Sequence, residues 1–237
     1  MAAADPLAAP PDPLRASLRE QLVRMRGGGS ALPEALLDVV REELAFGGEP
    51  VTVIRPRDWE ELRHQYGASG TPAPYWATTW PSGLALADAL EGRALAGRRV
   101  LELGCGLGIP SLVAARMGAR VLATDGSPDA VAFAAHNLAL NDAVGEVARA
   151  DWCDGPLSGG PWDLVLAADV LYLPRNVDAL LRLLPDLMAP GATAIVADPQ
   201  RAGGRAFVAA ARKIFRLETR ADRERPSVEL HTLRLRR

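Results

Sequence analysis

The sequence predicts an α/β fold in which a mostly parallel, seven-stranded sheet follows a mainly helical N-terminal extension. Three observations support this prediction. From about residue 74 onward, short apolar runs alternate with stretches of helical periodicity, the pattern expected of βαβ units. Most of these runs lack polar alternation, as parallel strands do when helices cover both faces. The last two runs have no helix between them, so we expect the sheet to end in an antiparallel hairpin.

Each element can be placed by its periodicity and its flanking residues. We expect strands at 98–103, 120–125, 145–150, 163–168, 192–197, 214–221 and 228–235. We expect helices between them at 83–91, 109–117, 128–141, 176–187 and 203–213. The carboxyl ends of the parallel strands should then meet at one edge of the sheet, which is where open α/β sheets bind ligands.

Composition divides the chain into three parts. Residues 1–13 are rich in Ala and Pro and predict a disordered tail. Residues 14–73 are assigned to the extension and residues 74–237 to a ligand-binding α/β domain. A stretch rich in Gly, Ser, Thr and Pro lies before the junction and is typical of a linker.

The extension contains signals for both helices and a strand. Apolar residues recur at helical spacing over Pro13–Arg26, which predicts a helix. A proline near the expected first turn favours a second helix over Pro33–Ala45. Alternating apolar residues over Glu49–Ile54 predict a strand, and Asp58 can cap a short helix after it.

Composition also narrows the function. The 237 residues carry 27 basic and 29 acidic side chains, and a net charge of −2 gives no basic surface for nucleic acid. No apolar run is long enough to span a bilayer, so no membrane partner is expected. Two cysteines give no disulfide framework, which favours a cytoplasmic protein. His64, His136 and His231 lack metal-ligand spacing, so no metal is expected.

The motif with the clearest chemistry runs from a buried strand through three glycines into a helix. Gly104, Gly106 and Gly108 let the backbone turn sharply and approach a ligand at a helix N-terminus. A dinucleotide-binding loop has the spacing G-x-G-x-x-G, whose third glycine would fall at Ile109. Glu102 precedes the loop, where a carboxylate suits an ammonium group better than a pyrophosphate. S-adenosylmethionine carries an ammonium and a sulfonium, so we predict it as the cofactor.

Two further acids end the next two strands. Asp125 lies about 20 residues beyond the loop, where nucleoside-binding α/β folds use a carboxylate for the ribose hydroxyls. Gly126 and Ser127 follow it and are included in the predicted cofactor site. Asp151 can accept a hydrogen bond from the adenine amino group, and the Trp152 indole can pack on the ring. The alternative is that the glycines only turn the chain and that Asp125 caps a helix.

The strand at 163–168 ends in Ala168, and Asp169 and Tyr172 follow it. In a doubly wound sheet this edge faces the transferable group, so Ala168 is assigned to the cofactor site. The Asp169 carboxylate can hold an amine beside an electrophilic methyl group, and the Tyr172 phenol can add a hydrogen bond or a cation–π contact. Both are predicted as catalytic residues. The alternative is that Asp169 caps a turn and Tyr172 fills a gap.

Two other segments lie at the expected ligand edge. Residues 74–83 precede the first helix of the α/β domain and should fold over the cofactor pocket. Trp80 in this segment is assigned to the cofactor site, with a hydrophobic staple as the alternative. Asp198 and Arg201 follow the fifth strand, where a salt bridge in the loop is favoured over a substrate contact.

These motifs resemble two levels of one family. The cofactor motifs resemble those of the seven-β-strand methyltransferases, whose fold is Rossmann-like, and the resemblance covers about residues 74–237. A narrower similarity is to the protein-lysine methyltransferase branch, and it is closest to the electron transfer flavoprotein β-subunit lysine methyltransferases. The motifs that carry this similarity are Tyr75-Trp76-Ala77, Trp80-Pro81-x-Gly83, Asp169-x-x-Tyr172 and Asp198-Pro199-x-Arg201. Ser82 stands where that branch usually has Gly. The resemblance implies that Asp169 and Tyr172 act on the acceptor side.

The predicted reaction is N-methylation of a protein lysine by direct displacement, driven mainly by proximity and orientation. A small-molecule N- or O-methyltransferase would use the same cofactor residues and stays open, as does a nucleoside-binding module without catalysis. A dehydrogenase is disfavoured because the loop of this chain lacks the third glycine of the dinucleotide-binding spacing. An RNA methyltransferase is disfavoured by the charge and by the lack of an Asn-Pro-Pro-aromatic motif.

Overall fold

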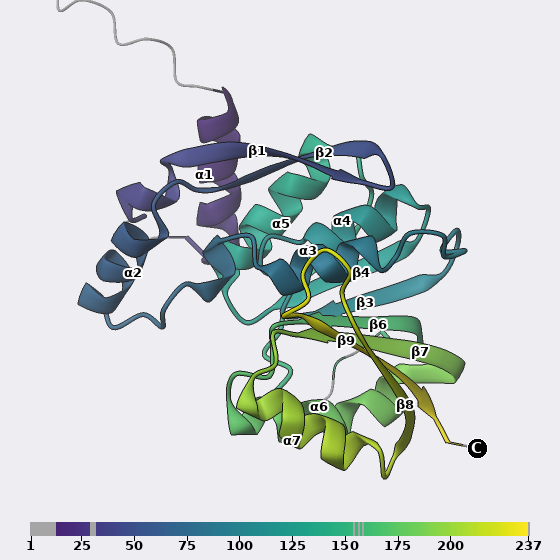
Figure 1. The fold of residues 1–237 in the computed structure, drawn as a ribbon. Helices are drawn as coiled ribbons and strands as arrows, with labels where there is room; N and C mark the ends of the chain where they lie inside the picture. The colour runs from purple at the N-terminus through teal and green to yellow at the C-terminus, as the bar shows by residue number, and fades with distance from the viewer. Residues whose placement is uncertain (1–12, 29–31, 154, 156, 158, 237) are drawn as a thin grey trace, which may run out of the picture.

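The computed structural model describes residues 13–28, 32–153, 155, 157 and 159–236 (Figure 1). The predicted disordered tail therefore lies outside the described residues, apart from Pro13. The centre of the molecule is a seven-stranded sheet with the order β5-β4-β3-β6-β7-β9-β8.

The sheet confirms the predicted fold class. Its strands are β3 (Arg99–Leu103), β4 (Arg120–Asp125), β5 (Glu146–Arg149), β6 (Trp162–Ala168), β7 (Met188–Asp198), β8 (Phe215–Ala221) and β9 (Glu229–Leu235). Strands β3 to β7 pair in parallel, whereas β9 runs antiparallel to both β7 and β8. The mostly parallel sheet thus ends in the antiparallel hairpin that the sequence predicts.

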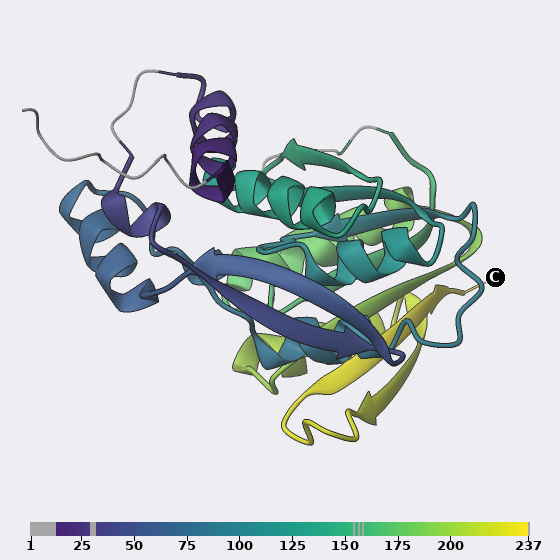
Figure 2. The same ribbon diagram turned by 90° about the horizontal axis from the view of Figure 1, so that it is seen from above.

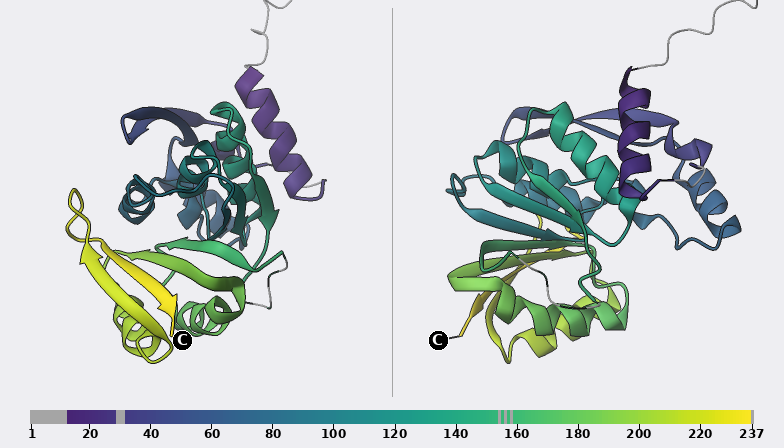
Figure 3. Two further views of the ribbon diagram at one scale, coloured as in Figure 1. Left: turned by 90° about the vertical axis from the view of Figure 1, so that its right-hand side faces the viewer. Right: turned by 180° about the vertical axis from the view of Figure 1, so that it is seen from behind.

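Helices cover both faces of this sheet, as Figures 1 and 3 show. One face carries α3 (Pro81–Asp88), α4 (Ile109–Arg116) and α5 (Pro128–Leu140), and the other carries α6 (Pro174–Leu187) and α7 (Ala202–Ala211). Successive side chains of a strand point to opposite faces. On β3, Val100 accordingly joins the core under α3–α5, and Leu101 and Leu103 join the core under α6 and α7.

The strand order reverses at β3, and this reversal sets where a ligand can bind. The chain moves outward from β3 through β4 to β5, and then returns to place β6 on the other side of β3. A crevice forms at the carboxyl ends of the strands where the direction of winding changes, and α/β proteins bind ligands there. The predicted site residues follow β3, β4, β5, β6 and β7 at this edge.

The extension differs from its prediction. It contains α1 (Pro13–Met25), a 3₁₀ turn (Glu34–Leu36), strands β1 (Val39–Phe46) and β2 (Glu49–Pro56), and α2 (Trp59–Ala68). The first helix, the strand and the Asp58 cap are confirmed, because the Asp58 carboxylate accepts a hydrogen bond from the Glu61 amide at 3.0 Å. The second helix, over Pro33–Ala45, is wrong: most of that range belongs to β1.

A two-residue turn explains the error. Gly47 and Gly48 join β1 to β2 with φ values of +59° and +80°. Positive φ at both central residues is the geometry that matches the twist of a tight hairpin. The hairpin gives each residue of β1 a partner on β2, from Val39 opposite Pro56 to Phe46 opposite Glu49. This pairing overrides the helical propensity of the Glu, Leu and Ala residues in β1.

Asn137 in α5 and Asn141 at its C-cap form hydrogen bonds with the backbone of β2, on the edge of the hairpin that does not pair with β1. The Asn137 side chain accepts from the Ile54 amide at 2.8 Å and donates to the Ile54 carbonyl at 3.2 Å. One helical turn later, Asn141 accepts from the Thr52 amide at 2.9 Å and donates to the Thr52 carbonyl at 2.7 Å. Each side-chain amide therefore acts as a paired peptide group would in a neighbouring strand.

A buried ion pair also fastens the extension to α5. The Arg26 guanidinium donates to both carboxylate oxygens of Asp129, at 2.6 and 2.7 Å, and the Tyr66 hydroxyl donates to the same carboxylate. Bidentate pairs of this kind are strong and geometrically specific. The apolar side chains of α1, β2 and α2 belong to the same core cluster as those of α5. Figure 2, seen from above, shows α1 and the β1–β2 hairpin on the side of the sheet that carries α3, α4 and α5.

Within the described ranges, no helix is long and apolar enough to cross a membrane. The same ranges contain no group of three or more His, Cys, Asp and Glu side chains that could hold a metal ion.

Candidate functional site

The glycine loop adopts the geometry that its spacing predicts. Gly104, Gly106 and Gly108 have φ values of +68°, +53° and +77°, which side chains rarely allow. A Cβ atom at Gly108 would lie 2.9 Å from Ala134 Cβ, and one at Gly104 would lie 2.9 Å from Val170 Cγ1. The loop thus packs closely against α5 on one side and against the segment after β6 on the other.

Asp125 holds the loop from the neighbouring strand. Its carboxylate accepts from the Gly106 amide at 3.0 Å and from the Ser127 amide at 2.9 Å. Burial raises the pKa of Asp125, although these backbone hydrogen bonds and the Gly126 amide lower it, and the charge of Asp151 raises it further. The structure therefore brings the predicted ribose acid directly against the glycine loop.

Glu102 lies beneath the loop and is already hydrogen-bonded. The carboxylate is 1% exposed and accepts from the Ser111 amide at 2.9 Å and from the Ser111 hydroxyl at 2.5 Å. Burial raises the pKa of Glu102 to about 8, against the lowering effect of these bonds, and the charge of Asp125 raises it as well. Glu102 thus fixes the first turn of α4, a role that its sequence position did not suggest.

The loop cysteine is chemically quiet. Cys105 is buried, and burial raises the pKa of its thiol, with the charges of Asp125 and Glu102 adding to the effect. A thiolate is the nucleophilic form of cysteine, so this environment disfavours covalent catalysis. Glu102 and Cys105 are buried, whereas Asp125 is partly exposed, so Asp125 is the group of the three whose charge can face a positively charged ligand.

Asp151 and Trp152 follow β5 but face different surroundings. Asp151 is exposed, and its carboxylate accepts from the Cys153 amide at 3.0 Å. A Cβ atom at Gly126 would lie 4.0 Å from Asp151 Cβ, so the ends of β4 and β5 are adjacent. Trp152 is buried in the core under α6. Most of the Trp152 surface already contacts protein, which leaves little of the ring for adenine. Packing of the indole on adenine stays a prediction.

The remaining predicted cofactor residues lie along the same edge. Ser127 caps α5 by accepting from the Ala130 amide at 3.4 Å. Ala168 is the last residue of β6 and pairs with Ala197 of β7. Trp80 directly precedes α3, and its indole donates to the Tyr75 carbonyl at 2.5 Å. Contact of these residues with a cofactor also stays a prediction.

Asp169 stands in an unusual backbone conformation at the end of β6. Its φ is +57°, a value that Asp tolerates better than most residues. Its amide donates to the Ala197 carbonyl at 2.9 Å, and its carboxylate accepts from Arg201 Nε at 2.5 Å. The Asp169 side chain is 9% exposed. Strained backbone at a strand end is common in functional sites.

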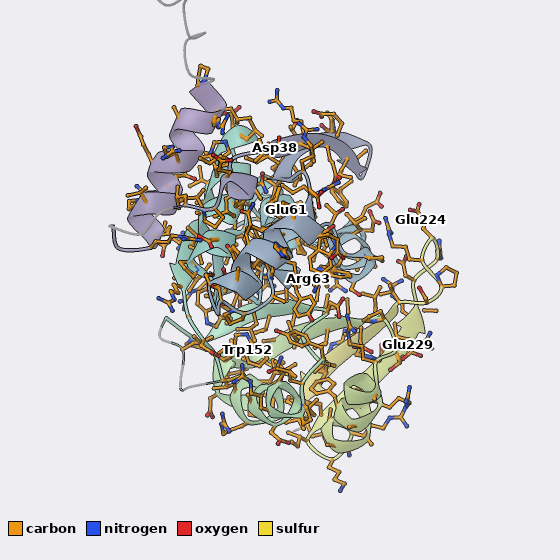
Figure 4. All side chains as sticks on the ribbon, turned by 90° about the vertical axis from the view of Figure 1, so that its left-hand side faces the viewer. Asp38, Glu61, Arg63, Trp152, Glu224 and Glu229 are labelled. Atoms are coloured by element: carbon orange, nitrogen blue, oxygen red, sulfur yellow. The ribbon has the colours of Figure 1, made fainter. Side chains whose placement is uncertain are left out.

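The aromatic side chains near Asp169 form a row that reaches the extension. The Tyr172 and Tyr75 rings lie 6.0 Å apart, and Tyr75 and Trp59 of α2 lie 6.1 Å apart, measured between centroids. Tyr75 and Tyr172 are each about half exposed, at 52% and 49%. The Arg63 guanidinium lies 5.9 Å from the Trp59 ring, and Figure 4 shows Arg63 projecting from α2 on this side. This aromatic row is open to solvent.

The segment at 74–83 lies against the glycine loop, and that it covers a cofactor stays a prediction. A Cβ atom at Gly106 would come within 3.4 Å of the Trp76 carbonyl oxygen. The Trp76 ring packs on Phe133 of α5 with centroids 5.1 Å apart. A Cβ atom at Gly104 would lie 2.9 Å from Val170 Cγ1, so the glycine loop lies beside the segment that carries Asp169 and Tyr172.

Arg201 forms a salt bridge, but not within its own loop. Its guanidinium pairs with Asp169, whereas its backbone amide donates to Asp198 at 2.8 Å. The expected loop salt bridge thus becomes a bridge between the ends of β6 and β7. Sequence reasoning also missed Asn137, which donates to the Leu107 carbonyl at 2.9 Å and so links the glycine loop to β2. Two Asn residues spaced four apart, at the end of a mostly apolar helix, were the available signal.

The fold defines a class of protein. The 16S rRNA N2 G1207 methyltransferase of T. thermophilus, solved with AdoMet and guanosine, superposes with a TM-score of 0.63 at 18% identity, covering 88% of this chain and 53% of that one. At this identity the likeness establishes the fold alone, which is that of the class I methyltransferases.

A sequence comparison gives the family. Residues 71–213 match the family described as lysine methyltransferase, and the chain belongs to that family. The electron transfer flavoprotein beta subunit lysine methyltransferase of Danio rerio is 37% identical over 135 residues, which are 55% of this chain and 52% of the relative. The same enzyme of Xenopus laevis is 35% identical over 136 residues, 54% of each chain. The chain spans about half the length of these relatives.

Proposed function

We propose that this protein is an S-adenosylmethionine-dependent methyltransferase that N-methylates a lysine of a protein. The observation that carries the proposal is the Asp125 carboxylate at the end of β4, which accepts from the Gly106 amide at 3.0 Å and from the Ser127 amide at 2.9 Å and so lies against the glycine loop. Such a site favours a cationic ligand over a pyrophosphate. Family membership and the acceptor-side pair Asp169 and Tyr172 support the transfer of methyl to an amine.

The residues present fit this cofactor. The loop glycines adopt the positive φ values that turn the chain at this edge, and the acids lie in the order that a nucleoside requires along β3, β4 and β5. Asp125 would hold the ribose hydroxyls and Asp151 the adenine amino group. Glu102 would act on the amino-acid end through the turn of α4 that it fixes by way of Ser111.

When bound, the cofactor supplies a methyl group on a sulfonium, which a neutral amine displaces while the C–S electron pair stays on sulfur. Asp169 would orient the amine by accepting a hydrogen bond from it, and Tyr172 would flank the side chain that carries it. Orientation of this kind can account for most of the catalysis of a displacement reaction. The proton of the lysine ammonium leaves to solvent before attack.

The half-exposed Tyr75 and Tyr172 favour a protein substrate over a small molecule. A small substrate is held best by an enclosed pocket, whereas a lysine on a folded protein needs an open rim. A cytoplasmic location is part of the proposal and rests on the low cysteine content.

Binding and transfer can be tested separately. Calorimetric titration with S-adenosylmethionine and S-adenosylhomocysteine, with NAD as the control ligand, should give binding of the first two. Asp125→Ala should weaken it by about 10- to 100-fold, because a charged hydrogen-bond partner contributes about 1.5 to 3 kcal/mol. Binding of NAD alone would contradict the proposal.

For transfer, the wild-type protein is incubated with methyl-tritiated S-adenosylmethionine and either purified electron transfer flavoprotein β-subunit or a bacterial lysate. Label on a protein lysine, located by mass spectrometry, is expected. Label only in the small-molecule fraction would favour the alternative substrate class, and no label with intact binding would favour a module without catalysis.

A further inference from the structure

The contact between Arg201 and Asp169 joins the two loops that follow β6 and β7. The two residues are 32 positions apart, and Arg201 Nε lies 2.5 Å from Asp169 Oδ1. The Asp169 side chain is 9% exposed and that of Arg201 39% exposed, so the pair sits at the surface of the crevice. The carboxylate that would orient the amine therefore already has a cationic partner.

The position of Arg201 is fixed from below by a buried acid. Asp198 is 1% exposed and accepts from the Arg201 amide at 2.8 Å through Oδ2. A Cβ atom at Gly204 would lie 2.1 Å from that same oxygen, so α7 packs tightly on it. Gln200 has a φ of +60°, and the turn that it makes points the Arg201 side chain back toward β6. This loop is built to hold one side chain in one place.

The charge of Arg201 matters for the chemistry. A lysine ammonium must lose its proton before it can attack a methyl group. An uncompensated carboxylate within hydrogen-bond distance favours the charged form of a neighbouring amine and raises its pKa, typically by about 1 to 3 units. With Arg201 in place, the Asp169 carboxylate is offset by a positive charge, and the entering amine meets a nearly neutral pair.

We propose that Arg201 is a positioning residue for methyl transfer: it holds the Asp169 carboxylate in place and offsets its charge, so that the bound lysine loses its proton at a lower pH than it would beside an uncompensated carboxylate. The inference rests on the proposed function, because it assigns a role within the same acceptor site.

Other charged groups near the pair do not replace this effect. Those whose charges act on Arg201 besides Asp169 are Asp198 on β7 and Tyr75 before α3, whereas Asp125 on β4 and Arg175 act on Tyr172. Burial chiefly raises the pKa of Asp198, to about 6, so its titration lies well below that of an amine. Arg175 acts on Tyr172 rather than on the carboxylate.

The test measures kcat and KM of three variants between pH 6.5 and 10. The acceptor is electron transfer flavoprotein β-subunit. If the wild-type protein labels lysate proteins and not this subunit, those proteins serve as the acceptor. Arg201→Gln removes the charge but keeps a donor group. Arg201→Lys keeps the charge. Arg205→Gln removes the same charge from the exposed face of the same helix. Affinity for S-adenosylhomocysteine, measured by calorimetry, checks that each variant keeps its fold.

In Arg201→Gln, the rise of kcat with pH should move up by about one unit or more, and kcat near pH 7.5 should fall about tenfold. KM for the acceptor should stay equal or fall, because the exposed carboxylate binds the ammonium form better. Arg201→Lys should restore the wild-type pH profile, and Arg205→Gln should not change it.

A uniform loss of kcat at every pH, or a higher KM with an unmoved profile, would show that Arg201 only braces the loop and would overturn the inference. Absence of label with the wild-type protein would instead overturn the proposed function, and the inference with it.

Discussion

The proposed site has two halves, one at the ends of β3 and β4 and the other at the ends of β6 and β7, and the carboxylates of the two halves have different partners. On the side of β3 and β4, Glu102 and Asp125 accept hydrogen bonds from backbone amides and from Ser111, all neutral donors. On the side of β6 and β7, Asp169 is paired with a guanidinium. The first arrangement leaves the charge of Asp125 without a cationic partner, and the second offsets the charge of Asp169 with Arg201.

The difference matches what each half is proposed to bind. A sulfonium is permanently charged, so negative potential stabilises it throughout binding. A lysine must arrive as a cation and react as a neutral amine, so a site with a compensated charge serves it better. The predictions below test whether the halves are as separate as this comparison implies.

The largest expected effect is on the acceptor half. Asp169→Asn removes the charge but keeps a residue that tolerates positive φ. We expect kcat for methyl transfer to fall about 100-fold, because misplacement of the reacting group costs about that much. Affinity for S-adenosylhomocysteine, measured by calorimetry, should be unchanged. A comparable loss of cofactor affinity would break the comparison, since it would place Asp169 in both halves.

The next effect concerns the link between the extension and the cofactor half. Asn137→Ala removes hydrogen bonds to both Ile54 and Leu107 and leaves their buried peptide groups without these partners. We expect the free energy of unfolding in urea to fall by about 2 to 3 kcal/mol and cofactor affinity to fall as well. Asn141→Ala, which bonds β2 but not the glycine loop, should lower only stability. Equal effects of the two variants on affinity would contradict the link.

A smaller effect should appear in the pH dependence of stability. The pKa of folded Glu102, about 8, lies above its ordinary value of 4.5, so the folded state retains a proton that the unfolded state releases. Its stabilising contribution is full below pH 4.5 and is lost as the pH rises toward 8. Glu102→Gln cannot ionise, so its stability should gain on the wild type as the pH rises from 5 to 8.

Urea unfolding at several pH values without cofactor measures this gain. Glu218→Gln, an exposed change on β8, is the control and should follow the wild type. Parallel stability curves for Glu102→Gln and wild type would mean that Glu102 is ionised in the fold.

The smallest effect should come from the aromatic row. Tyr75→Leu removes the ring beside Tyr172, and we expect KM for the protein acceptor to rise about two- to fivefold, since an exposed cation–π contact contributes about 0.5 to 1 kcal/mol. Tyr75→Phe keeps the ring and should behave as wild type. A change in kcat alone would indicate that Tyr75 acts on the reaction rather than on docking.

The sequence predicted the sheet and its ligand edge because those features are local. Gly104 and Asp125 each stand at the end of an apolar strand, and the pattern of one strand is enough to place them. The pairing of Arg201 with Asp169 was not predictable in this way, because it depends on how far two loops extend from neighbouring strands. The salt bridge was expected, but its partner was assigned to the wrong strand end.

The β1–β2 hairpin also could not be predicted from the local sequence. Residues 39–45 have helical propensity when considered alone, and only the turn at Gly47-Gly48 with the partner strand reverses it. The side-chain amides of Asn137 and Asn141 could not be assigned a role before the outer edge of β2 was known to lie against α5. Tertiary contacts decided both cases.

The asparagine link has a consequence for how the molecule comes apart. Because one side chain bonds both β2 and the glycine loop, the extension cannot detach while the loop keeps all of its partners. A chain shortened to begin at residue 74 would expose the apolar face of α5 and remove both Arg26 and Tyr66, the partners of the Asp129 carboxylate. We therefore expect heating to melt the described chain in one cooperative step, with residues 13–28 and 32–73 serving as part of the folding unit rather than as an appendage to it.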